Sequence, residues 1–367
     1  MLGRYLEGPS NPSSQHLHGR RSRAELDSAI ELIGGCLGTL LDQPGGARLI
    51  ITSGGTESNH LALAGLGEQG PIILSRIEHP SVIATAQRLE QQGRTLRWLE
   101  VDRDGLIQVE ALKNLITIDG TRASLVSIMA ANNETGVLQP IRQAADICRV
   151  AAVPMHVDGT QTVGKLPLNL EDCGVSALTF TAHKFHGPVG VGALWLAPKL
   201  KVQPVLHGGE QQLETRPGTE PVALAAGMAE ALRLAVMEMK TTCDHTQMLR
   251  DRLENGLIER HPSLVVQGQS HPRLPTTTAI SFLGTDRQSM LMALDLAGIA
   301  CSSGSACSSG SSPPSHVLTA MQRPSEEIDS TLRFGVSKFS TVEEIDHAID
   351  AISIVYNKLR NKTSVDN

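Results

Sequence analysis

Short apolar runs alternate with stretches of helical periodicity between about residue 20 and residue 240, and this alternation constrains the fold more than any other feature. It predicts an α/β protein with a mostly parallel, seven-stranded sheet whose strands are joined by crossover helices. The expected helices include Glu57–Leu66, Val82–Gln91 and Gln143–Ala152. The expected strands are Arg48–Thr52, Pro71–Leu74, Leu96–Val101, Ser124–Ala130, Met155–Val157, Ala177–Thr181 and Gly192–Leu196.

A long helix is expected from Pro221 to about Arg260, where Ala, Leu, Met and Glu dominate and proline opens the first turn. The elements expected after it are strands Ser263–Gln267, Thr277–Phe282 and Thr331–Val336, a helix Gln288–Leu296 and a final helix from Val342. This order predicts a smaller α+β domain. We therefore expect a large domain over residues 15–240 and a small domain over residues 241–367 together with residues 1–14.

The composition is that of a globular protein of 367 residues, of which 40% are hydrophobic and 19% are charged. The formal net charge of −6 and the 2% of aromatic residues argue against nucleic acid as a partner, because its binding needs a basic surface or stacking platforms. No apolar run approaches the roughly 20 residues of a membrane span, and the N-terminus lacks the apolar stretch of a signal peptide. We expect a cytoplasmic protein without membrane partners.

The six cysteines are scattered, which fits a reducing compartment, and no Cys-x-x-Cys pair supports a metal site. Cys301 and Cys307 lie in a Ser/Gly-rich stretch from Gly298 to Pro314 that lacks core periodicity and predicts an exposed loop. A thiol on such a loop can reach into a site and back out to a partner. The alternative is a flexible linker with incidental thiols.

Lys184 ends an apolar run and follows Asp158, at the tip of an earlier strand, by 26 residues. This pair matches the needs of pyridoxal phosphate, because a lysine amine forms the Schiff base and an aspartate keeps the pyridine nitrogen protonated. An ordinary strand-end lysine and a turn aspartate are the alternative. The pair predicts a pyridoxal phosphate site, and the neighbouring motifs test this prediction.

Three further motifs follow predicted strands. The turn Ser53–Thr56 opens a helix with small residues, so backbone N–H groups of Gly55 and its neighbours can approach a phosphate. His79 could stack on a cofactor ring, and Asn133 could bond a phenolic oxygen or a substrate carboxylate. Helix capping and turn chemistry are the alternatives. All these positions fall at carboxyl ends of strands, where open α/β sheets bind ligands.

With these motifs assembled, the chain resembles the NifS/IscS-like cysteine desulfurases, which belong to the class V, fold-type I pyridoxal phosphate enzymes. The resemblance runs from about Asn11 to Ala351 and rests on several ordered motifs. They are Ser53-Gly54-Gly55-Thr56-Glu57-Ser58, Glu78-His79, Asn132-Asn133-Glu134-Thr135-Gly136, His156-Val157-Asp158-Gly159-Thr160-Gln161, Ala182-His183-Lys184, Arg216-Pro217-Gly218-Thr219-Glu220, Gly304-Ser305-Ala306-Cys307-Ser308 and Leu332-Arg333-Phe334.

The resemblance implies a role for each motif residue. Lys184, Cys307 and His79 would be catalytic, with Lys184 as the Schiff-base lysine and Cys307 as the persulfide-forming nucleophile. Arg333, with Asn133, would bind the substrate carboxylate, for which a guanidinium fork suits better than lysine. The implied cofactor-binding residues are Gly55, Thr56, His79, Asn133, Asp158, Gln161, Thr181, His183, Lys184 and, from a neighbouring subunit, Thr219. No metal ligand is implied.

Several segments depart from the family pattern. Family members usually open with a strand and an Asp-Asn-x-Ala-Thr-Thr segment, so roughly 20 residues are expected to be missing before the first helix, through a late start or a real loss. Ser176 stands where an aspartate is usual, and Lys338 replaces a common arginine. The stretch Gly209–Glu214 differs from the usual Gly-Gly-Gln-Glu pattern.

The leading functional hypothesis is a homodimeric cysteine desulfurase that converts L-cysteine to L-alanine and carries sulfur as a persulfide. The sulfur acceptor would be an iron–sulfur scaffold protein or a tRNA-thiolation protein. One alternative is another class V activity, such as selenocysteine lyase, cysteine lyase or aminotransferase, although these do not need a loop thiol. The other is a truncated, weakly active paralogue.

Overall fold

The computed structural model describes residues 3, 11–41, 43–67, 69–304 and 313–363. Of these, residues 361–363 are described by their backbone only. The chain divides into two compact units, and the main change of unit falls between Met239 and Lys240, close to the predicted boundary. Residues 11–14 group with the first unit, not with the C-terminal one. The first unit comprises Met1–Leu99, Val109–Ala130 and Pro140–Met239, and the second comprises Glu100–Gln108, Ala131–Gln139 and Lys240–Asn367.

The first unit is built on the predicted seven-stranded, mostly parallel sheet. The strands stand in the order β1-β9-β8-β7-β6-β2-β3, so β1 and β3 are its edges. Only β9 runs against its neighbours β1 and β8; the other pairs are parallel. The strands are β1 (Arg48–Thr52), β2 (Ile72–Ser75), β3 (Leu96–Leu99), β6 (Leu125–Met129), β7 (Met155–Asp158), β8 (Ala177–Thr181) and β9 (Gly192–Leu196).

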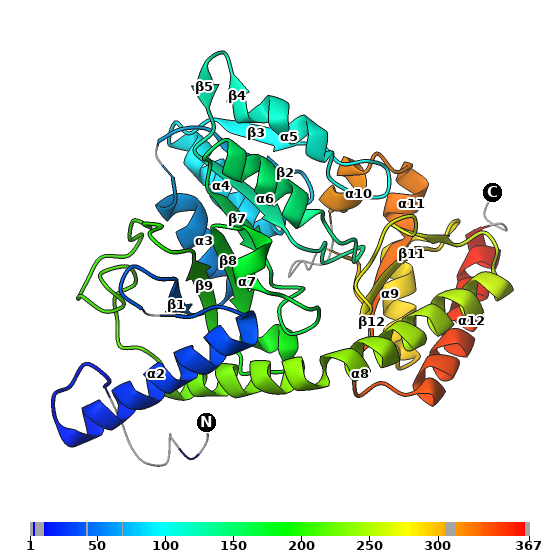
Figure 1. The fold of residues 1–367 in the computed structure, drawn as a ribbon. Coiled ribbons are helices and arrows are strands. Elements are labelled where there is room, and N and C mark those ends of the chain that lie inside the picture. The colour runs from blue at the N-terminus through cyan, green and yellow to red at the C-terminus, as the bar shows by residue number, and fades with distance from the viewer. Residues whose placement is uncertain (1–2, 4–10, 42, 68, 305–312, 364–367) are drawn as a thin grey trace. The chain divides into compact units, whose positions relative to one another are not determined.

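Helices follow the strands in the expected alternation (Figure 1). Apolar side chains of α3 and α4 pack with those of the central strands into a core that includes Leu63, Leu74 and Leu194, all fully buried. This core fixes α3 and α4 above the sheet. The helices of the unit are α2 (Leu17–Leu37), α3 (Gly55–Gly65), α4 (Pro80–Gln91), α5 (Val109–Ile116), α6 (Ile141–Val150), α7 (Leu170–Cys173) and the 3-10 helix η1 (Ala182–Phe185), with a small hairpin of β4 (Thr117–Ile118) and β5 (Thr121–Arg122).

The long helix α8 (Val222–Arg260) begins in the first unit and ends in the second. The second unit contains a three-stranded antiparallel sheet in the order β10-β11-β12, as the predicted α+β character requires. Its core gathers Leu253, Phe282, Met290 and Tyr356 from different elements. The other elements are β10 (Val265–Val266), β11 (Thr277–Ser281), α9 (Arg287–Leu296), α10 (His316–Ala320), α11 (Ser325–Ser330), β12 (Thr331–Gly335) and α12 (Val342–Thr363).

Apart from α2, a first helix that was expected without a stated range, the elements that sequence reasoning did not predict are short: α5, α7, η1, α10, α11 and the hairpin β4–β5. Helices of four to eight residues complete too few turns to show a 3.6-residue period, so tertiary packing has to decide them. Within the described part of the chain, none of the helices combines the length and the apolarity needed to cross a bilayer.

Candidate active site

Four strands of the first unit bring the predicted site residues to one edge of the sheet. β2, β7 and β8 are linked through parallel pairs, and β1 runs in the same direction because two antiparallel pairs with β9 separate it from β8. The turn Ser53–Thr56 follows β1, His79 follows β2, Asp158 ends β7, and Lys184 lies in η1 directly after β8. The predicted gathering at carboxyl strand ends therefore holds for these four positions. Asn133 likewise comes four residues after the end of β6, in a stretch that groups with the second unit.

Asp158 is held rigidly at the end of β7. The backbone N–H of Thr160 donates to its Oδ1 at 2.9 Å, and the Nδ2 amide of Asn59 donates to its Oδ2 at 2.8 Å. The side chain is 5% exposed. One oxygen is thus bound within its own turn and the other from helix α3, which leaves the carboxylate little freedom to rotate.

Two buried titratable groups lie near Asp158 and are mostly uncharged near pH 7. Burial raises the pKa of Glu78 to about 8. Hydrogen bonds from the Ser75 hydroxyl at 2.5 Å and the Met129 N–H at 2.8 Å act in the opposite direction and limit this rise. Burial lowers the pKa of His156 to about 4, with the Asp158 charge opposing it. Neither group therefore neutralises the Asp158 carboxylate, which suits it to pair with a cationic ring nitrogen.

Lys184 has basic neighbours that the motif analysis did not single out. Burial, followed by the charge of Lys184, lowers the pKa of Lys165 to about 8. Burial and the charges of Lys184 and Lys165 also lower the pKa of His183. Lys165 donates from Nζ to Oε1 of Gln161 at 3.1 Å, one helical turn away in sequence. Three basic side chains grouped in this way provide a place for an anion.

The turn before α3 has the features of a phosphate site. Its N-cap residue is Gly54, which supplies no side-chain cap to the helix N-terminus. A Cβ added at Gly55 would lie 3.3 Å from Oγ1 of Thr160, so a larger side chain would crowd the turn. Thr181 donates from Oγ1 to the Val191 carbonyl at 3.0 Å and lies 3.1 Å from Nδ1 of His183, while the Thr56 side chain is exposed. Small residues and a helix N-terminus together favour an anion here.

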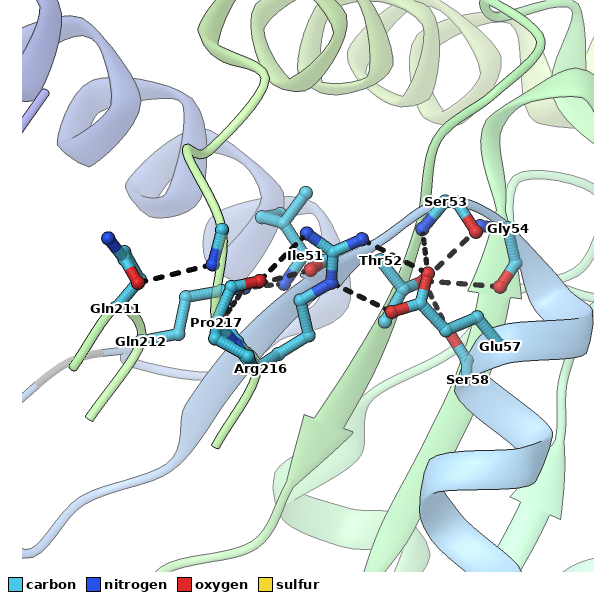
Figure 2. A network of polar contacts seen from close by, with 11 residues as sticks. Ile51, Thr52, Ser53, Gly54, Glu57, Ser58, Gln211, Gln212, Arg216 and Pro217 are labelled. Carbon is cyan, nitrogen blue, oxygen red and sulfur yellow. Dashed lines mark hydrogen bonds and ion pairs between the residues drawn. The ribbon is translucent and has the colours of Figure 1, made fainter. Parts of the chain in front are cut away.

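An ion pair ties this turn to the loop that carries Thr219. Figure 2 shows the Glu57 carboxylate facing the Arg216 guanidinium, with Nε–Oε1 at 2.7 Å, and the Ser53 N–H bonded to Oε2 at 2.7 Å. Burial alone would raise the pKa of Glu57, but the hydrogen bonds from Arg216 and Ser53 outweigh it and lower the pKa. Thr219, three residues after Arg216, is exposed. This pair was not among the predicted site residues, because its members lie 159 positions apart.

The same loop also covers the edge strand β1. The Gln212 amide accepts from the Ile51 N–H at 2.6 Å and donates to the Ile51 carbonyl at 2.9 Å, so a side chain takes the place of a neighbouring strand (Figure 2). Gln212, Leu213 and Glu214 all have positive φ, between 51° and 60°, which is unfavourable for residues other than glycine. The unusual Gly209–Glu214 sequence therefore adopts a strained loop that the Gln212 contacts hold in place.

The second unit holds Arg333 and both described ends of the Ser/Gly-rich segment. Arg333 donates from Nη1 to the Asn133 carbonyl at 2.9 Å, and its backbone pairs with Ser302. Glu134 accepts a 2.6 Å hydrogen bond from the Ser315 hydroxyl, and a Cβ added at Gly304 would lie 2.7 Å from the same carboxylate. The Asn132–Gly136 turn is thus connected to both ends of the segment. Cys307 itself lies outside the described residues.

Cys301, the other thiol of this segment, is half-buried. Burial, assisted by the Asp295 charge, raises its pKa to about 11. A thiol must ionise to act as a nucleophile, so Cys301 is poorly suited to that role near neutral pH. This leaves the predicted nucleophile, Cys307, without a competitor among the two loop thiols.

A family model matches almost the whole chain. Residues 4–348 match the aminotransferase class-V family, and the chain belongs to that family. It is 38% identical over 355 residues to a protein named cysteine desulfurase IscS from Dictyoglomus turgidum. The aligned region covers 95% of this chain and 88% of that protein.

Solved structures agree as well. The X-ray structure of a NifS-like protein from Rickettsia africae superimposes with a TM-score of 0.87 and 30% identity, covering 97% of this chain and 94% of the other. A structure described as SspA in complex with cysteine gives a TM-score of 0.74 and 28% identity, covering 90% and 92%.

Enzymes of this family use pyridoxal phosphate, and the first unit has groups that fit each part of it. The glycine-rich turn at α3 and the basic cluster of Lys184, Lys165 and His183 suit a phosphate and an aldehyde carbon. The fixed Asp158 carboxylate suits the pyridine nitrogen. The donor set therefore fits the cofactor.

Proposed function

We propose that this protein is a pyridoxal phosphate-dependent cysteine desulfurase, which converts L-cysteine to L-alanine and holds the sulfur as a persulfide on Cys307. The observation that supports this most is the placing of Asp158 and Lys184 at adjacent strand ends, since β7 and β8 pair directly. The relatives named cysteine desulfurase, and the related structure that contains cysteine, support the choice of substrate.

In this proposal the first unit binds the cofactor. Lys184 forms the covalent link, Asp158 pairs with the ring nitrogen, and His79 stacks on the ring. Gln161 and Asn133 lie on the phenolate side. The phosphate is held by Gly55, Thr56, Thr181 and His183, together with Thr219 of a second copy of the chain. When bound, the cofactor withdraws electrons from the substrate and acidifies its α-carbon.

The second unit supplies the groups for substrate and sulfur. Arg333 binds the cysteine carboxylate through its guanidinium fork, beside the Asn133 backbone that it already contacts. Lys184 or His79 takes the α-proton. The Cys307 thiolate then attacks the substrate sulfur, so that an S–S bond forms while the C–S bond breaks with its electron pair remaining on carbon. Protonation of that β-carbon, together with return of a proton to the α-carbon, gives alanine.

The partners of the reaction are part of the proposal. The exposed Thr219 and its ion-paired loop support a homodimer in which each copy completes the phosphate site of the other. The persulfide would pass to an iron–sulfur scaffold or a tRNA-thiolation protein in the cytoplasm.

The test is to incubate the cofactor-loaded protein with L-cysteine, quantify alanine and locate added sulfur by mass spectrometry. We expect one alanine per sulfur transferred. We also expect an addition of about 32 Da, the mass of one sulfur atom, on Cys307. Cys307→Ser should form no persulfide and almost no alanine, because a serine hydroxyl is scarcely ionised. Cys301→Ser is the matched control and should behave as the parent. Sulfur on Cys301, or normal turnover by Cys307→Ser, would favour a lyase or aminotransferase instead.

A further inference from the structure

The ring of His79 is fixed by the helix that it caps. Its Nδ1 accepts the backbone N–H of Ser81 at 3.1 Å as the N-cap of α4, and it lies 2.8 Å from the Ser81 hydroxyl oxygen. A backbone N–H can only donate, so Nδ1 carries a lone pair and no proton. The Ser81 hydroxyl must then donate to the same nitrogen.

The hydroxyl is oriented in turn by Asn59. Nδ2 of Asn59 donates to Oγ of Ser81 at 3.0 Å and to Oδ2 of Asp158 at 2.8 Å, so both amide hydrogens are used. A carboxylate only accepts, which fixes the amide with its nitrogen toward Asp158. Asn59 is 1% exposed, and its Oδ1 has no hydrogen-bond partner among the described residues.

We propose that Asn59 and Ser81 are positioning residues that hold His79 in its Nε2–H tautomer and connect it to Asp158. The tautomer follows from the hydrogen bonds alone, and only the role of His79 in catalysis rests on the proposed function. A neutral His79 fixed in this way presents an N–H at Nε2, where it can donate a hydrogen bond or a proton but cannot accept one. Removal of the α-proton then falls to Lys184, and His79 serves as the proton donor.

The direct test reads the tautomer without any turnover. Protein labelled with 15N at histidine is studied by NMR with and without pyridoxal phosphate, and the His79 signals are identified by their loss in His79→Gln. We expect protonated Nε2 and unprotonated Nδ1 in the parent. Ser81→Ala keeps the backbone N–H donor at 3.1 Å but loses the hydroxyl at 2.8 Å, so we expect a mixture in which a detectable minority carries the proton on Nδ1. Asn59→Ala should show the same mixture; if its buried cavity prevents folding, Ser81→Ala, at a half-buried position, carries the test.

Activity gives a second readout. Ser81→Ala should lower kcat by roughly tenfold with little change in KM, as expected for losing one neutral hydrogen bond that orients a catalytic group. Ser81→Thr, which keeps the hydroxyl, should restore both kcat and the single tautomer. Ser28→Ala, whose exposed hydroxyl bonds only its own helix at Ala24, is the matched control.

A parent protein with the proton on Nδ1, or a tautomer that is unchanged in Ser81→Ala, would overturn the inference even if cysteine is turned over. A protein that turns over no cysteine but shows the expected tautomers would overturn the proposed function and leave the positioning role intact.

Discussion

The two units hold their functional residues by different means. In the first unit the side chains are held by local contacts as well as long-range ones: Asp158 is bound by Thr160 and His79 by Ser81, each two residues away, while Asn59 reaches Asp158 across 99 positions. In the second unit the ties described above join distant segments: Arg333 reaches Asn133 across 200 positions, and Ser315 reaches Glu134 across 181. The local contacts follow from the turns at the strand ends, whereas the long-range ties exist only once the chain has folded.

This difference suggests a division of labour. A sheet edge held by backbone pairing keeps Asp158 and Lys184 at a fixed separation, which a covalently attached cofactor requires. Side-chain ties between distant segments are found beside the described ends of the segment that carries Cys307, the proposed nucleophile. Changes at Lys184 in the first unit should therefore remove chemistry, and changes in the second unit, apart from Cys307, should weaken anchoring or binding.

The largest effect is expected at Lys184. Lys184→Ala should reduce alanine formation by more than about a thousandfold, because it removes both the covalent link and a proton acceptor. Cofactor should still bind through the phosphate contacts, which absorbance and equilibrium dialysis can follow. Lys113→Ala removes an exposed lysine paired with Glu110 and is the control. Turnover that survives in Lys184→Ala would remove the central assignment of the first unit.

A smaller but still large effect is expected from a long-range tie of the second unit. Ser315→Ala removes the hydrogen bond to the buried Glu134 carboxylate and the N-cap of α10, since the Ser315 hydroxyl also accepts from the Leu318 N–H. Losing a cap and a bond to a charged group should together lower the free energy of unfolding by about 3 kcal/mol.

Urea unfolding measures this loss, and Ser315→Thr, which keeps the hydroxyl, should recover most of it. An unchanged unfolding midpoint in Ser315→Ala would mean that Glu134 is not an anchor, and the contrast between the units would lose its main support.

Substitution of Arg333 distinguishes a substrate-binding role, which would change the KM for L-cysteine, from a cofactor-binding role, which would change cofactor occupancy. Arg333→Lys keeps the charge but loses the fork, so the KM for L-cysteine should rise by about fiftyfold, on the order of 2 kcal/mol, while cofactor binding stays unchanged. Steady-state alanine assays give the KM, and the cofactor absorbance gives occupancy. A fall in occupancy instead of a rise in KM would assign Arg333 to the cofactor.

Sequence reasoning was accurate where local pattern determines position. All seven strands of the large sheet were predicted, and Asp158 and Lys184 stand at their carboxyl ends, because apolar runs and the residues that follow them are visible one at a time. Asn59 and Ser81 were missed, since each looks like an ordinary helix residue until α3 packs beside α4. The Glu57–Arg216 pair was missed because its members lie 159 positions apart. Lys165 had a weak signal, its position one helical turn after Gln161.

The smallest expected effect tests the buried electrostatics of the first unit. In the folded protein Glu78 keeps its proton up to about pH 8, whereas in the unfolded chain it ionises near its ordinary pKa of 4.5. The folded state therefore binds more protons than the unfolded state between these pH values, and the free energy of unfolding falls as the pH rises. His156 acts in the opposite sense, because its pKa falls from 6.5 to about 4 on folding, but only between those values. Lys165, whose pKa falls to about 8 on folding, makes stability rise with pH from near that value. The window from pH 6.5 to 7.5 is therefore dominated by Glu78, and at about 1.4 kcal/mol per pH unit wild-type stability should decline by about 1 kcal/mol across it. Glu78→Gln, which retains an acceptor for Ser75 and Met129, should abolish this decline, whereas Glu110→Gln, at an exposed carboxylate, should not. Parallel pH profiles for the parent and Glu78→Gln would show that Glu78 is ionised in the folded protein, and Asp158 would then share its site with a second negative charge.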